Sequence, residues 1–198
     1  MGERSASVVQ ACVTALCDSI PKFASIFAEK GYTCIDSDFG SPGEGKMPLS
    51  SQNLMDSLSE GMPSPSFKEY NLMWLGSELK VSLRLSGSPF PPVIFAQGFA
   101  SLVAQTYISS NPAHGLFLIS PPLSNESLFP SVLPTSLPEF DYELQFPVAV
   151  MARPAEMAQL KKYSRLGQDE HVDLFELDNL EGSDAFLRIE QWLDELGI

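Results

Sequence analysis

The sequence predicts an α/β protein with a mostly parallel sheet of about six strands and helices on both faces. Short apolar segments rich in β-branched residues alternate with longer segments whose apolar residues recur at helical spacing. A strand, a helix and a further strand in succession place the two strands parallel in one sheet. With 198 residues, 44% of them hydrophobic, the chain can bury one sizeable core. We therefore expect a single domain over residues 1–198, arranged in three layers.

The first half of the chain supplies two of the predicted strands. Ser7–Val13 and Tyr32–Ile35 are short apolar runs, whereas Ser19–Lys30 has its apolar residues on one helical face. Residues 41–66 are rich in glycine, proline and serine, which predicts an irregular loop. Phe67–Leu85 has leucines at helical spacing and is the expected crossover helix.

The second half repeats the strand and helix pattern. Frequent prolines make residues 121–145 a second irregular loop. The remaining elements are recognised by continuous apolar runs for strands and by one-sided apolar spacing for helices. The predicted strands are Pro92–Ala96, the run from Gly115 to its exit turn at Pro122, Phe146–Met151 and Val172–Leu177. The predicted helices are the one that follows Ala100, Pro154–Tyr163 and Ser183–Leu196.

The rest of the chain is organised around residues 92–105. A buried strand ends at Ala96, the chain turns over three residues, and helical spacing begins at Ala100. In a nucleophile elbow, strand and helix pass so closely that the positions two before and two after the tip must be small. Ala96 and Ala100 supply that pair, and Gly98 stands at the tip. The stretch resembles the nucleophile elbow of the α/β-hydrolase superfamily.

A second resemblance lies at residues 27–40, which are similar to the superfamily's helix, strand and D-x-x-G loop. Asp36 and Gly40 are one residue further apart than in that pattern. Only Met1–Ala6 precede the first predicted strand. The resemblance therefore implies the superfamily fold without its first two strands, and without a large lid.

The resemblance does not extend to the catalytic groups of the superfamily. Gly98 occupies the position of the serine, and residues 179–186 contain no histidine where the superfamily has one. His114 and His171 both precede strands, so neither is expected to reach the elbow. Glu156 loosely matches the acid, but it reads better as a charge at a helix N-terminus. We therefore expect no enzyme, but a non-catalytic protein that acts by binding as a protein-interaction or scaffold subunit.

Two alternatives remain open on the sequence. A small molecule can occupy a vestigial pocket above Gly98, lined by Phe99, Cys12 and Phe39. Alternatively, Ser101 is the nucleophile of an atypical esterase or thioesterase. The second interpretation shifts the elbow by three residues, which puts the bulky Phe99 and Val103 at the positions that must be small.

Charge and composition exclude several classes of function. A formal charge of −13 opposes binding to nucleic acid or to an anionic membrane. No phosphate-binding glycine motif is present, and the three cysteines lack zinc spacing, so we expect neither cofactor nor metal. Asp36 and Asp38 read as turn residues rather than metal ligands. We expect an intracellular, cytoplasmic protein. The resemblance to the superfamily places Tyr32–Ile35 at one edge of the sheet, and we expect a protein partner or a second copy there.

Overall fold

The computed structural model describes residues 11–15, 25, 27–31, 33–37, 70–88, 90–128 and 138–197. The described strands form one six-stranded sheet in the order β2-β1-β3-β4-β5-β6, and every neighbouring pair is parallel. The strands are β1 (Ala11–Ala15), β2 (Thr33–Ser37), β3 (Val93–Gln97), β4 (Gly115–Ile119), β5 (Val148–Ala152) and β6 (Val172–Glu176). The described part of the chain includes the helices α3 (Tyr70–Leu85), α4 (Ala100–Ile108), η1 (Glu126–Leu128), α5 (Pro154–Tyr163), α6 (Arg165–Gln168) and α7 (Ser183–Glu195), and residues 27–29 are helical as well. The predicted parallel α/β class is confirmed.

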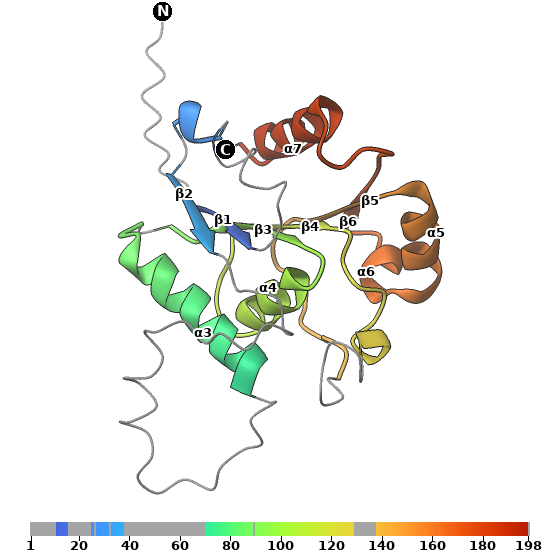
Figure 1. The fold of residues 1–198 in the computed structure, drawn as a ribbon, viewed down its shortest axis with the longest axis horizontal. Helices are drawn as coiled ribbons and strands as arrows, with labels where there is room; N and C mark the ends of the chain where they lie inside the picture. The colour runs from blue at the N-terminus through green and yellow to red at the C-terminus, as the bar shows by residue number, and fades with distance from the viewer. Residues whose placement is uncertain are drawn as a thin grey trace, which may run out of the picture.

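The sheet is the middle of three layers (Figure 1). On one face, a hydrophobic cluster joins the sheet to α3, α4, α5 and α6. On the other face, a second cluster joins it to α7 and to Phe27. Strands β4 and β5 are buried along their whole length because helices cover both of their faces. This explains why they appear in the sequence as continuous apolar runs rather than as alternating patterns.

Element boundaries differ from the prediction where the hydrophobic pattern does not mark an end. β1 runs to Ala15 and β2 to Ser37, beyond the predicted ends at Val13 and Ile35. Residues 7–10 of the first predicted strand lie outside the described residues. α6 and η1 were not predicted, since segments of four and three residues are too short to show a helical period. The predicted loop 41–66 lies outside the described residues.

β2 lies at one edge of the sheet, as predicted, and β6 lies at the other. Pairing of β2 with a partner or with a second copy stays a prediction. In the described part of the chain, no helix combines the length and the apolar character needed to cross a membrane.

Candidate active site

The order of the strands marks one point on the carboxyl edge of the sheet. The chain proceeds from β1 outward to β2 and then returns to the other side of β1 to form β3. In open α/β sheets, ligands bind outside the carboxyl ends of the strands at such a change of direction. The turn that follows β3 is the one that the sequence identified as an elbow.

Gly98 forms the tip of this turn between β3 and α4. Its φ is +57°, and a methyl group added at its Cα would meet no atom within 4 Å. The Gly98 amide donates to the carbonyl of Ile119 at 2.9 Å, which joins the tip to the end of β4. Ala96 and Ala100 are both fully buried, as close packing of strand and helix requires. The elbow therefore has its open tip next to the last residue of β4.

Ser120 follows Ile119 and is the one described non-glycine residue with a positive φ, at +46°. Its Oγ donates to Oε2 of Glu156 at 2.7 Å, and its amide donates to the carbonyl of Met151 at 2.8 Å. A non-glycine residue in this region of φ and ψ costs roughly 1–3 kcal/mol, and such strain gathers at functional sites. Glu156 lies in the first turn of α5, and both side chains are half-buried.

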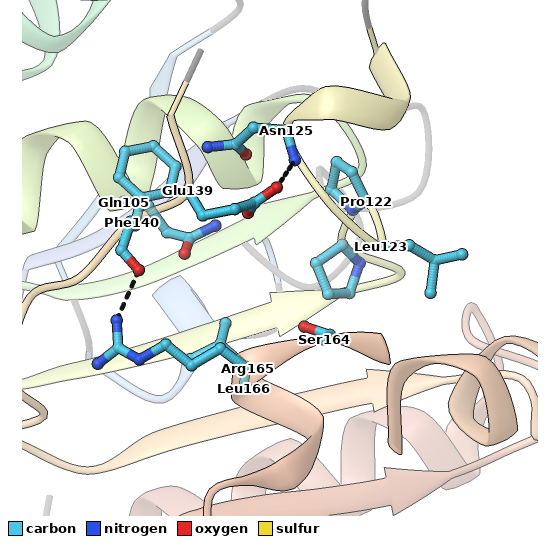
Figure 2. Close-up of a pocket in the computed structure, with 10 residues that line it drawn as sticks. Gln105, Pro122, Leu123, Asn125, Glu139, Phe140, Ser164, Arg165 and Leu166 are labelled. Atoms are coloured by element: carbon cyan, nitrogen blue, oxygen red, sulfur yellow. Dashed lines mark hydrogen bonds between the residues drawn. The ribbon is translucent and has the colours of Figure 1, made fainter. Parts of the chain in front are cut away.

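The residues after Ser120 border a small polar cavity of about 30 Å³ (Figure 2). Pro122 lies on one side, Gln105 of α4 on another, and Ser164 and Arg165 on the side of α5 and α6, and Pro121 also belongs to the lining. This volume suits a single water molecule, not an organic substrate. Neither Gly98 nor Ser120 belongs to the lining of this cavity.

Hydrogen bonds that involve side chains hold the segment 138–142 beside this cavity. Arg165 donates from its Nη1 to the carbonyl of Phe140 at 2.7 Å and from its other terminal nitrogen to the carbonyl of Tyr142. The amide of Asn125 donates to Oε1 of Glu139 at 2.6 Å, and both the Phe140 and the Glu139 contacts are drawn in Figure 2. These bonds hold the loop that follows β4 close to the carboxyl edge of the sheet.

The structure describes two of the residues predicted to act at the site, Ser101 and Phe99, more fully than the others. Ser101 lies one turn into α4, is 0% exposed, and has an Oγ without a hydrogen-bond partner. It therefore cannot meet a substrate in this conformation. Phe99 is half-buried against the core beside Gly98. Phe39 lies outside the described residues, and the structure describes Cys12 as a member of β1 but not its side chain. The predicted pocket lined by these three residues is thus not tested.

Neither histidine lies near the elbow. The His114 amide donates to the carbonyl of Pro92 at 2.8 Å, just ahead of β3 and β4. His171 immediately precedes β6, is exposed, and contacts Asp169 through its Nδ1. Both lie at the amino edge of the sheet, opposite the candidate site. Within the described ranges, no cluster of three histidine, cysteine or acidic side chains is arranged to hold a metal.

Sequence reasoning missed Ser120 because no motif marks it. Its only signal is its place directly after a buried strand and before two prolines. Glu156 was seen, but it was assigned to the N-terminus of a helix. It occupies that position and also binds Ser120.

Comparison with solved structures gives the fold its name. A candidate hydrolase of the α/β superfamily from Xanthomonas campestris matches with a TM-score of 0.55 and 17% identity, over 92% of this chain and 99% of that one. A monoacylglycerol lipase from Paleococcus ferrophilus matches with a TM-score of 0.57 and 10% identity, over 94% of each chain. This chain has the α/β-hydrolase fold. A lipase-esterase related protein from Clostridium acetobutylicum matches the same fold with a TM-score of 0.56 and 11% identity, over 94% of this chain and 95% of that one.

No family model matches the sequence, and no curated protein matches it. The absence of the α/β-hydrolase superfamily's first two strands and the degenerate state of its site stay predictions.

The expectation that this α/β-hydrolase-fold chain is not an enzyme is wrong. The three solved structures described above carry the names of a hydrolase, a lipase and a lipase-esterase related protein, which point toward enzymatic activity. The expectation depended on the missing serine at Gly98 and the missing histidine after β6. Since catalytic groups can be supplied by other elements that end at the same edge, the loss of two motif positions was not sufficient to exclude catalysis.

Proposed function

We propose that this chain hydrolyses esters or thioesters at the carboxyl edge of its sheet, with Ser120 as the nucleophile and Glu156 as the proton acceptor. The hydrogen bond from Ser120 Oγ to Glu156 Oε2 at 2.7 Å carries the proposal. A serine hydroxyl is a weak nucleophile until an adjacent base takes its proton. The carboxylate of Glu156 can accept that proton as Oγ attacks the acyl carbon.

The elbow supplies the second requirement of acyl transfer, which is stabilisation of the oxyanion. α4 begins at Ala100, two residues after the tip at Gly98. The amides of Ser101 and Leu102 donate to the carbonyls of Gly98 and Phe99, whereas the amides of Phe99 and Ala100 make no hydrogen bond among the described residues. These amides offer hydrogen bonds to the negative oxygen of the tetrahedral intermediate. When that intermediate collapses, Glu156 returns its proton to the leaving group. Water then hydrolyses the acyl-enzyme by the same proton transfers.

The position of the pair supports this assignment. Ser120 follows β4 and Glu156 follows β5, and these strands lie on the same side of β3, which carries the elbow. The Gly98–Ile119 hydrogen bond places the elbow tip beside the end of β4. A single acyl group on the open edge therefore faces both the Ser120 hydroxyl and the first turn of α4.

Two variants of the pair test the proposal. We expect Ser120→Ala and Glu156→Gln each to lower turnover of a short-chain p-nitrophenyl ester by about 100-fold or more, the usual contribution of a nucleophile's base. A fluorophosphonate probe should label Ser120 in the unmodified protein, as located by peptide mass spectrometry. Ser101→Ala is the matched control, because it removes a buried hydroxyl that makes no hydrogen bond.

The dependence on pH gives an independent test. An esterase that depends on histidine loses activity as its imidazole becomes protonated, with an inflection near pH 6.5. The described site contains no histidine, so the profile should show no such inflection. Full turnover in Ser120→Ala, or an inflection abolished by replacing His114 or His171, would contradict the proposal.

A further inference from the structure

A larger cavity of about 340 Å³ lies at the opposite, amino edge of the sheet. It is bounded by the end of α3, by the segment ahead of β3, and by the end of α4 with the residues that follow it. Its volume falls within the range of small-molecule sites, whereas the cavity beside Ser120 does not. The proposed catalytic pair makes no use of it.

Two cations of α3 face this cavity. Lys80 and Arg84 are four residues apart and so lie on one side of the helix. Among the described residues, neither forms an ion pair; the pairs that exist are Lys30–Glu190, Lys161–Glu176 and His171–Asp169. In a chain with 25 acidic and 12 basic residues, two unpaired cations in one cavity indicate an anionic occupant.

Neutral donors stand beside these cations. Tyr107 of α4 is 7% exposed, and burial raises the pKa of its hydroxyl, so that the group stays a donor. The charge of Arg84, which lines the same cavity, opposes that rise in pKa. Asn111 is fixed through its Nδ2, which donates to the carbonyl of Tyr107 at 2.9 Å.

The rest of the lining is mainly apolar, with Leu83, Phe90 and three prolines beside Ser86 and Ser88. Phe90 is 57% exposed, and its amide donates to the Ser88 hydroxyl at 3.3 Å. The Ser88 amide in turn donates to the hydroxyl of Ser86 at 3.2 Å, and that hydroxyl donates to the carbonyl of Leu83 at 2.7 Å. These bonds tie the backbone of Phe90 to the end of α3, where its ring lines the cavity and is largely exposed.

We propose that this cavity binds an amphipathic organic anion, whose carboxylate pairs with Arg84 and Lys80 and whose apolar part lies on Leu83 and Phe90. The planar guanidinium of arginine accommodates a carboxylate with two parallel hydrogen bonds. The cavity walls and Phe90 shield an alkyl or aryl group from water. The site is independent of the hydrolytic proposal, because it lies at the other edge of the sheet.

Titration calorimetry with octanoate tests the site directly. Octanoate should bind, whereas 1-octanol lacks the charge and acetate lacks the apolar group, so both should bind more weakly. Arg84→Gln should weaken octanoate binding by about tenfold, in line with the loss of a charged hydrogen bond. Phe90→Ala should weaken it by a smaller factor. Arg188→Gln on α7, which covers the other face of the sheet, is the matched control with the same change of charge.

The outcomes separate the site from general hydrophobic binding. A loss in Arg84→Gln together with an unchanged Arg188→Gln supports the proposal. Binding of octanol as tight as that of octanoate would overturn it, as would equal effects of the two arginine variants or no heat of binding at any soluble concentration. None of these measurements uses esterase activity, so the hydrolytic proposal can fail without affecting this one.

Discussion

Replacing Gly98 with alanine tests whether substrate passes over the tip of the elbow. The new methyl group would meet none of the described residues, since none of them has an atom within 4 Å of its position. The direct cost is confined to the backbone. A non-glycine residue at a φ of +57° costs about 1–2 kcal/mol. The lower entropy of the unfolded chain offsets about 0.4–1 kcal/mol of that cost.

The net loss of stability should therefore be about 1 kcal/mol, which lowers the Tm by about 2–4 °C in a domain of this size. The effect on activity should be much larger. A methyl group beside the acyl carbon displaces the substrate from Ser120, and displacements of this size reduce rates by up to about 100-fold. We expect kcat/KM for the p-nitrophenyl ester to fall at least tenfold in Gly98→Ala.

Gly87→Ala is the matched control for this prediction. Gly87 has a φ of +70°, and a methyl group added at its Cα would also meet no atom within 4 Å, but this glycine lies after α3, ahead of β3. Both variants should lose similar stability in thermal unfolding followed by circular dichroism, and only Gly98→Ala should lose activity. If the two variants keep the same kcat/KM, the substrate does not contact Gly98, and the placement of the site is refuted.

Two further predictions concern the loop over α4 and the edge of the sheet. The Tyr142 hydroxyl donates to Oε1 of Gln105 at 3.0 Å, and burial raises its pKa well above the ordinary value. The stability that the neutral phenol contributes is therefore complete below about pH 10 and is lost as the pH rises further. In urea unfolding, the free energy of unfolding of Tyr142→Phe should decline less steeply at alkaline pH than that of the unmodified protein. An unchanged slope would contradict this prediction. Pairing of β2 with a second copy predicts a dimer fraction that grows with concentration in analytical ultracentrifugation, and a monomer throughout would exclude it.

The sequence predicted the parallel α/β arrangement because burial on both faces leaves a local signature. β4 and β5 are continuous apolar runs, and the leucine stripe of α3 buries Leu79 and Leu83 against the sheet. The elbow could also be predicted from the sequence. Ala96 and Ala100 must be small because the strand and the helix that they belong to pack closely, and the two residues are only four positions apart. Each of these features depends on residues close together in the chain.

The sequence was misleading about catalysis because it was read only at motif positions. It showed that Gly98 has no hydroxyl, and this was taken to exclude an enzyme. It contained no sign that Ser120 and Glu156, 36 residues apart, form a hydrogen bond. The strain at Ser120 was equally hidden, since serine has no sequence preference for positive φ.

By itself, the sequence determined the fold class and the elbow with its glycine tip, and the resemblance to the α/β-hydrolase superfamily implied the place of β2 at an edge. Only the tertiary structure decided which side chains meet at the two ends of the sheet. Parallel strands bring every carboxyl end to one edge, which joins Ser120 to Glu156. The same packing brings Arg84 of α3 beside Tyr107 of α4 at the other edge. Such pairs depend on how distant segments of the chain pack together, and local sequence patterns do not predict that packing.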